Sequence, residues 1–422
     1  MPKIQITARG IRAALKNYTP FQSLVEYIWN GFDAQASKIE ISYSANELGG
    51  IDSVSIKDDG YGIAHGKLQE KFESVFESKK ALQNKLKRNL SALHGKNGIG
   101  RLTFFTFARN AYWKTVYADT EGNRTYDIYA NAENINLYTG INTVPKKTEL
   151  STGTEVTFGG VYSLTKHDLE TGFLDFLLSE FSWFLALNSQ RGFSITLNGE
   201  PLDYRGHIAD EENFEIIHDK TGTVFSITYV RWKEKLPKEP SRYYYLDSSG
   251  KEKWKEASAI KNKGDKFFHS MFIKSAYFDS FSFQTSEENG QDPLLGGARS
   301  DAQFRFMRKK TANYLRIKRK PFLDEFADKL VLEYENAQII SPSEKPGKRD
   351  ISQIIRMLYK MQPRLFSSLN LEQKKMLVGL LELAIGSDKK ADIPKIINSI
   401  IELSEEEQNE LSEIFSRKDA PE

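Results

Sequence analysis

The sequence predicts an α+β protein in which sheets and helices share the first 340 residues and helices alone follow. Segments with strand-like alternation of apolar and polar residues recur between amphipathic helical segments, and several of them end in glycine or asparagine turns. The run IISPSEKPGKRD then has the composition of a linker. We therefore expect domains at 1–160 and 161–340, a linker at 341–350 and a helical region at 351–422.

The composition excludes several classes of protein. The chain has 422 residues, a formal net charge of +2, six histidines and no cysteine. A disulfide or a thiolate metal site is therefore excluded, and the scattered histidines lack the spacing of zinc ligands. We find no signal-peptide pattern and no apolar run long enough to span a membrane. These features lead us to expect a cytoplasmic protein without membrane partners.

The first motif lies on a predicted helix, TPFQSLVEYIWNGFDA. Thr19 suits the N-cap and Pro20 suits the first turn. Glu26 and Asn30 are four residues apart, so they share one helix face. There, a carboxylate can act as a general base while an amide oxygen binds a hard cation such as Mg²⁺. Taken alone, the pair is more typical of ordinary solvated polar residues. The predicted apolar face of this helix consists of Leu24, Ile28 and Phe32.

The second motif, DDGYGI, follows the alternating segment IDSVSIK. Asp58 therefore lies at the end of a buried strand, where its carboxylate can accept a hydrogen bond from an exocyclic amine such as that of adenine. Gly60 and Gly62 let the backbone approach a bound base closely. A plain Asp-Gly turn is the alternative interpretation of the dipeptide.

The third motif is the glycine loop GKNGIGR, which precedes the helix-like segment LTFFTFA. Glycines before a helix present backbone amides to an anion. Its G-x-x-G-x-G spacing is neither the dinucleotide fingerprint nor a P-loop. The segment that leads into the loop is basic and has no acid, so it predicts either a mobile lid over phosphates or a solvated loop. The basic residues here are Lys79, Lys80, Lys85, Lys87, Arg88, Lys96 and Arg101.

With the fourth motif, Gly153 and Thr154 in STGTEVTF, the chain resembles the GHKL superfamily. This superfamily comprises gyrase B, the ninety-kilodalton heat-shock chaperones, histidine kinases and MutL, together with the MORC ATPases. The resemblance implies a Bergerat fold, an α/β sandwich with helices on one face of a mixed sheet. It also implies an ATPase that uses ATP and Mg²⁺.

The resemblance assigns roles to individual residues. Glu26 would be the general base, Asn30 the Mg²⁺ ligand, Asp58 the acceptor for the adenine amine, and Thr154 a support for Asp58 and a bound water. The expected ATP-binding residues are Asn30, Asp33, Ala34, Asp58, Gly60, Gly62, Ile63, Ser78, Lys79, Gly95, Lys96, Asn97, Gly98, Ile99, Gly100, Arg101 and Thr154.

Within the superfamily, the chain is most similar to MORC proteins and to stand-alone bacterial ATPases. No histidine precedes Glu26 to serve as a phospho-acceptor, and GKNGIGR departs from the loop of MutL. The similarity implies homodimerisation on ATP binding, with DNA as a candidate partner and genome maintenance or antiviral defence as the setting. The alternative function is a nucleotide-gated scaffold with little hydrolysis that regulates a partner effector such as a nuclease.

The second region begins with a helix whose aromatic stripe is typical of a core, followed by strands and an Asn-Gly turn. This order resembles the transducer domain of MutL and gyrase B, which sends a basic residue to the γ-phosphate. The candidates for that residue are Arg299, Lys309 and Lys310. The basic and aromatic stretch 305–320 can track a nucleic-acid backbone or form a solvated helix. The C-terminal helices, for which Asn370 is a candidate N-cap, predict a docking or oligomerisation module or a solvent-capped bundle.

Overall fold

The computed structural model describes the chain in segments and divides it into two compact units. The first unit comprises Met1–Ala257 and Phe268–Phe304, and the second comprises Ser258–Phe267 and Arg305–Glu422. Each unit is described separately below. The described residues are 8–73, 100–135, 137–236, 241–258, 260, 264–281, 299–340, 351–367 and 369–385.

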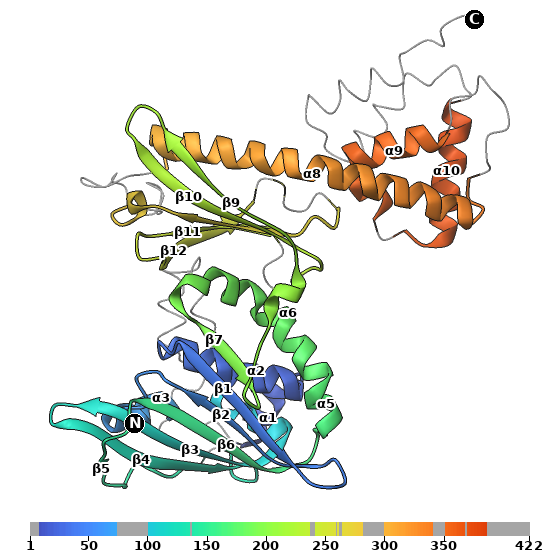
Figure 1. Cartoon of the computed structure of the whole chain (residues 1–422). Coiled ribbons are helices and arrows are strands. Elements are labelled where there is room, and N and C mark those ends of the chain that lie inside the picture. Colours follow the sequence, from blue (N-terminus) through green and yellow to red (C-terminus); the bar gives the residue numbers. More distant parts are fainter. Residues whose placement is uncertain are drawn as a thin grey trace, which may run out of the picture. The chain divides into compact units, whose positions relative to one another are not determined.

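An eight-stranded mixed sheet forms the base of the first unit (Figure 1). Its strand order is β5-β4-β3-β6-β2-β1-β7-β8. Neighbouring strands pair antiparallel, except that β1 and β7 are parallel. The strands are β1 (Lys38–Ala45), β2 (Ile51–Asp58), β3 (Ala108–Asp119), β4 (Gly122–Asn131), β5 (Lys146–Lys147), β6 (Gly153–Val161), β7 (Ser194–Leu197) and β8 (Glu200–Pro201).

Two helices, α2 and α6, lie together on one face of this sheet (Figure 1). The indole nitrogen of Trp29 on α2 donates a hydrogen bond to Glu180 Oε1 on α6 at 3.0 Å. The ring of Trp29 also packs against Phe181, with 4.7 Å between centroids. This aromatic contact fixes α2, which carries the first motif, against the core. The helices of this region are α1 (Ala8–Leu15), α2 (Pro20–Asp33), α3 (Leu68–Glu73), α5 (Lys166–Glu170) and α6 (Gly172–Leu187), with short 3₁₀ helices η1 (His65–Lys67), η2 (Gly100–Thr106), η3 (Ser189–Arg191) and η4 (Tyr204–His207).

The first sheet extends further along the chain than the expected boundary at residue 160. Strand β7 pairs in parallel with β1, and β8 pairs with β7. The helix and hairpin over 172–201, which the sequence suggested as the start of the second domain, therefore belong to the first sheet and its covering layer. The aromatic stripe of α6 is in the core, as predicted, because Phe173, Phe181 and Phe184 are buried there.

A five-stranded sheet completes the first unit, with the order β12-β11-β13-β10-β9. Only β11 and β13 are parallel. Trp183 of α6 stacks on Tyr244 of β11 at 5.9 Å, so a continuous core joins the two sheets. The strands are β9 (Ile208–His218), β10 (Thr223–Trp232), β11 (Ser241–Leu246), β12 (Glu252–Ala257) and β13 (His269–Lys274), followed by η5 (Ala276–Phe278).

The second unit is built around the helices α8 (Ala302–Asn336), α9 (Ile351–Met361) and α10 (Leu371–Ile385), with η6 (Pro363–Phe366) between the last two. Arg319 and Asp265 form an ion pair at 2.5 Å within this unit. Asn370 caps α10, because its Oδ1 accepts the Gln373 N–H at 2.9 Å. The predicted linker at 341–350 lies outside the described residues. No helix in the described segments is both long and apolar enough to cross a membrane.

Candidate functional site

The helix α2 presents the first motif as the sequence predicted. Thr19 Oγ1 accepts the Gln22 N–H at 3.2 Å, and Gln22 Oε1 accepts the Thr19 N–H at 2.9 Å. This capping box fixes where the helix begins. The apolar face is buried, while Glu26 and Asn30 are half-buried on another face. The buried positions are Leu24, Ile28 and Phe32.

Gly100 lies directly opposite the Glu26 and Asn30 pair. A Cβ atom at this position would come within 2.8 Å of Glu26 Oε2 and 3.7 Å of Asn30 Nδ2. A side chain at position 100 would therefore take the space beside the carboxylate. Glycine at position 100 therefore lets the backbone at the start of η2 pack closely against these two polar side chains.

Asp58 is the last residue of β2, and its carboxylate is held by backbone groups. Its Oδ1 accepts the Gly60 N–H at 2.9 Å, and it also accepts a backbone hydrogen bond from Thr154. Burial raises the pKa of Asp58 from 3.8 to about 6, although these two hydrogen bonds oppose the shift. A carboxyl group with this pKa is a strong acceptor at neutral pH and is already fixed in direction.

The neighbouring carboxylate, Asp59, holds backbone N–H groups near the start of β1. Its Oδ1 accepts the Ser37 and Lys38 N–H groups at 2.7 and 2.9 Å. Burial alone would raise the pKa of Asp59, but these hydrogen bonds lower it below its ordinary value. Asp59 therefore ties the start of β1 to the end of β2 and leaves Asp58 as the carboxylate of the pair that faces the site.

Close backbone approaches hold the second motif in place. A Cβ at Gly60 would lie 2.6 Å from the Ala34 carbonyl oxygen, which accepts the Tyr61 N–H at 3.0 Å. Gly62 has φ +72°, and a Cβ there would lie 2.0 Å from the Val116 carbonyl oxygen. A side chain at either position would clash with these carbonyl oxygens, so glycine is required for the turn after Asp58 to pack as it does.

Two residues that sequence reasoning missed also shape this end of the site. Gly31 lets α2 approach β2, because a Cβ there would meet Ile39 Cδ1 at 2.5 Å and Asp58 Cβ at 3.0 Å. Thr115 of β3 is fully buried, and its Oγ1 lies 3.0 Å from Thr154 Oγ1. A glycine inside an amphipathic helix was a signal for the first. No local pattern distinguishes Thr115.

Residues 18–154 match the family model described as "Histidine kinase-, DNA gyrase B-, and HSP90-like ATPase". This part of the chain belongs to the GHKL superfamily. The match supports ATP binding by the domain, and it contains the residues of all four predicted motifs. The similarity to MORC proteins in particular stays a prediction. The sequence matches no curated protein.

Among solved structures, the chain is similar to the N-terminal domain of a DNA repair protein, at 13% identity and a TM-score of 0.36. That comparison covers 71% of this chain and 95% of the other. A second similar structure is the ATPase region of Saccharomyces cerevisiae topoisomerase II, at 14% identity and a TM-score of 0.36. It covers 71% of this chain and 85% of the other.

The glycine loop of the GHKL domain falls only partly within the described residues. Gly100 and Arg101 are described at the start of η2. The Arg101 carbonyl accepts the Tyr27 hydroxyl at 2.7 Å, and its guanidinium lies 5.2 Å from the Phe72 ring centroid. Burial lowers the pKa of Arg101 to about 10. The predicted positions outside the described residues are Ser78, Lys79, Gly95, Lys96, Asn97, Gly98 and Ile99.

The residues present fit a magnesium nucleotide. Across the described segments, no group of three or more His, Cys, Asp or Glu could hold a metal on its own. Mg²⁺ in nucleotide sites takes few protein ligands and draws the others from phosphates and water. Asn30, whose side-chain amide lies near Gly100, has the donor chemistry for such a ligand.

The candidate γ-phosphate residues have other contacts. Arg299 Nη2 lies 3.4 Å from Glu256 Oε2, and its guanidinium lies 5.3 Å from the Trp254 ring centroid. Lys309 and Lys310 are exposed on the part of α8 that belongs to the second unit, and the Lys310 ammonium lies 5.4 Å from the Phe306 ring centroid. The role of all three in binding the γ-phosphate stays a prediction.

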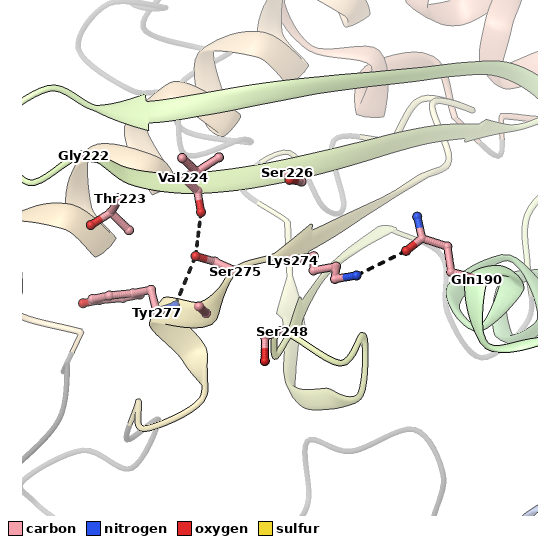
Figure 2. Close-up of a pocket in the computed structure, with 10 residues that line it drawn as sticks. Gln190, Gly222, Thr223, Val224, Ser226, Ser248, Lys274, Ser275 and Tyr277 are labelled. Carbon is pink, nitrogen blue, oxygen red and sulfur yellow. Dashed lines mark hydrogen bonds between the residues drawn. The ribbon is translucent and has the colours of Figure 1, made fainter.

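A pocket of about 740 Å³ lies away from the predicted motifs, at the ends of β10 and β13 (Figure 2). Lys274 Nζ reaches Gln190 Oε1 at 3.4 Å across it, and Ser275 Oγ donates to the Val224 carbonyl at 2.6 Å. None of the predicted site residues lines this pocket. It therefore does not belong to the GHKL motifs.

Proposed function

We propose that this chain is a Mg²⁺-dependent ATPase that acts as a nucleotide-driven dimerisation switch or clamp. The observation that supports this proposal most strongly is the pairing of Glu26 and Asn30 on one face of α2, close to the backbone of Gly100 in the third motif. A carboxylate and an amide in this arrangement serve hydrolysis, whereas adenine binding alone requires neither.

The roles of the residues follow from their chemistry. The Asp58 carboxylate accepts the adenine amine, because two backbone N–H groups already fix its direction. Glu26 takes a proton from the attacking water. Asn30 holds Mg²⁺, which neutralises the phosphates when it is bound. Thr154 supports Asp58 through its backbone and a bound water through its hydroxyl.

The dimerisation switch rests on the resemblance and on charge. The segment from Lys79 to Arg101 is basic and has no acid, so bound phosphates would neutralise it. The residues before Thr19 would then cross to the second protomer. DNA as the client and genome defence or maintenance as the setting extend the proposal, because the sequence resembles MORC and stand-alone bacterial members.

Light scattering with and without a non-hydrolysable ATP analogue tests the switch. We expect the analogue to convert monomer or loose dimer into tight dimer, and Gly98→Val to block the conversion. Equal mass and shape in both states would contradict the switch. A constitutive dimer held by the C-terminal helices is the competing outcome. Truncation after Pro346 distinguishes it from the ATP-induced dimer, because only the constitutive dimer would then dissociate.

ATP turnover measured with and without DNA tests the enzymatic part. ATP turnover by the wild type, together with its loss in Glu26→Ala, supports the ATPase. ATP binding without turnover, whether or not DNA is present, would favour the nucleotide-gated scaffold that regulates a partner effector. The presence of a carboxylate at position 26 favours the ATPase.

A further inference from the structure

Thr115 forms a junction of hydrogen bonds inside the GHKL domain. Its Oγ1 accepts the backbone N–H of Ile63 at 2.8 Å and lies 3.0 Å from Thr154 Oγ1. The residue has 0% exposure. A buried hydroxyl is unfavourable unless it is hydrogen-bonded, and these contacts satisfy the hydroxyl of Thr115.

The junction connects the two segments that hold Asp58. In the sheet, Thr115 lies opposite Thr154, and Thr154 lies opposite Asp58, so the three residues form one row across β3, β6 and β2. On the other side, Ile63 follows Gly62, whose backbone packs against β3 so closely that a Cβ would lie 2.0 Å from the Val116 oxygen. Thr115 is thus the shared partner of the second and fourth motifs.

The single hydroxyl proton of Thr115 has a defined set of acceptors. The Ile63 N–H already donates to its oxygen, and the acceptors within reach are Thr154 Oγ1 at 3.0 Å and the Gly153 carbonyl at 3.4 Å. The shorter contact favours donation to Thr154. The Thr154 hydroxyl then keeps its own proton for a further acceptor.

We propose that Thr115 is a positioning residue for adenine recognition, which acts through Ile63 and Thr154 without touching the nucleotide. This inference rests on the proposed function, because it assumes that Asp58 binds adenine. Thr115 locks the glycine turn after Asp58 and the start of β6 to the same strand. Without its hydroxyl, these two segments lose their common anchor and Asp58 loses its fixed direction.

Thr115→Val tests the hydroxyl at nearly constant side-chain size. It leaves the half-buried Ile63 N–H without this acceptor, so we expect ATP affinity to fall about tenfold. Thr115→Ser keeps the hydroxyl and should bind ATP like the wild type. Thr125→Val is the matched control. Thr125 lies opposite Val116 on β4, and its buried Oγ1 has no hydrogen-bond partner among the described residues.

The readout is calorimetric binding of ATP and GTP to the full chain with Mg²⁺. A merely structural change would weaken both nucleotides, whereas loss of adenine positioning weakens ATP alone and shrinks the ATP-to-GTP preference by about tenfold. Thr154→Val should lower this preference too, and the double variant should lose little more than Thr115→Val. Fully additive losses would contradict action through Thr154.

Several outcomes overturn the proposal. The hydroxyl of Thr115 is not responsible for ATP affinity if Thr115→Val binds ATP like Thr125→Val. The same conclusion follows if Thr115→Ser loses as much ATP affinity as Thr115→Val. If Thr115→Val fails to fold, amide hydrogen exchange at Ile63 is the deciding measurement. Slow exchange in both the wild type and Thr115→Ser, together with equal ATP affinity of the two proteins, supports the junction. Fast exchange at Ile63 contradicts it. A wild type that binds no ATP would contradict the proposed function itself.

Discussion

The two ends of the site are built by different means. At the proposed adenine end, Asp58 is fixed by backbone N–H groups from Gly60 and Thr154, and β2 and β6 are in register around it. At the proposed reaction end, Glu26 and Asn30 share a helix face that packs closely against Gly100. We infer that the proposed recognition of adenine depends on mutually supporting backbone contacts, whereas the proposed hydrolysis depends on the side chains of Glu26 and Asn30.

Glu26→Ala should separate the two ends most strongly. Removal of a positioned general base typically reduces a rate by about a hundredfold or more. ATP affinity should stay near that of the wild type, because the adenine end is unchanged. Phosphate release measured beside calorimetric binding checks both quantities. Undiminished turnover would contradict the general-base role.

Asp58→Asn should weaken ATP binding, the quantity that Glu26→Ala leaves near its wild-type value. The loss of a charge-assisted hydrogen bond to the adenine amine costs about 1.5–3 kcal/mol, which corresponds to roughly ten- to a hundredfold in affinity. The fold should survive, since asparagine has the same size. Calorimetry gives the affinity, and circular dichroism checks the fold. Equal ATP affinity in variant and wild type would show that Asp58 does not bind adenine.

Gly100→Ala should affect the reaction end more than the adenine end. The new Cβ would lie 2.8 Å from Glu26 Oε2, so the carboxylate has to move. We expect turnover to fall about tenfold, the smaller end of the effect of a displaced general base, with a lesser change in ATP affinity. Gly66→Ala is the control, because a Cβ there meets nothing within 4 Å. Equal turnover in both variants would argue against the contact.

The smallest expected effect concerns pH. A change of pH should shift the free energy of unfolding and the ATP affinity in opposite directions. Burial raises the pKa of Asp58 from 3.8 to about 6, so its protonated form favours the folded state. This contribution to the free energy of unfolding is complete below pH 3.8 and is lost as pH rises through about 6. ATP affinity should change in the other direction and fall below pH 6, because the carboxylate is the better acceptor. Both trends should vanish in Asp58→Asn.

Local signals in the sequence were sufficient to predict helix α2 and the end of strand β2 at Asp58. Thr19, Pro20 and the apolar spacing of α2 predicted its start and its buried face. The glycines after Asp58 predicted a close approach of the backbone to a bound base, which stays a prediction; in the structure, Gly60 and Gly62 lie close to the carbonyl oxygens of Ala34 and Val116. Thr115 escaped notice because its importance comes from register with β6, a pairing of residues that are 39 positions apart.

Pairing between distant strands also explains the boundary of the first sheet. The pattern over 172–201 correctly indicates a helix, a strand and an Asn-Gly turn. It cannot indicate that β7 adds to β1, because that choice depends on which sheet edge is open in the folded chain. Family resemblance placed these elements in the second domain, where the next strands do form a separate sheet.

The central claim is that Asp58 and its backbone supports select an adenine nucleotide. Calorimetric titration of the wild-type chain with non-hydrolysable analogues of ATP and GTP, in the presence of Mg²⁺, tests it directly. The account predicts one ATP analogue bound per chain and at least about tenfold weaker binding of the GTP analogue, because guanine has a carbonyl oxygen where adenine has the amine that would donate a hydrogen bond to Asp58. Equal binding of the two analogues, or no binding of either, would contradict the account.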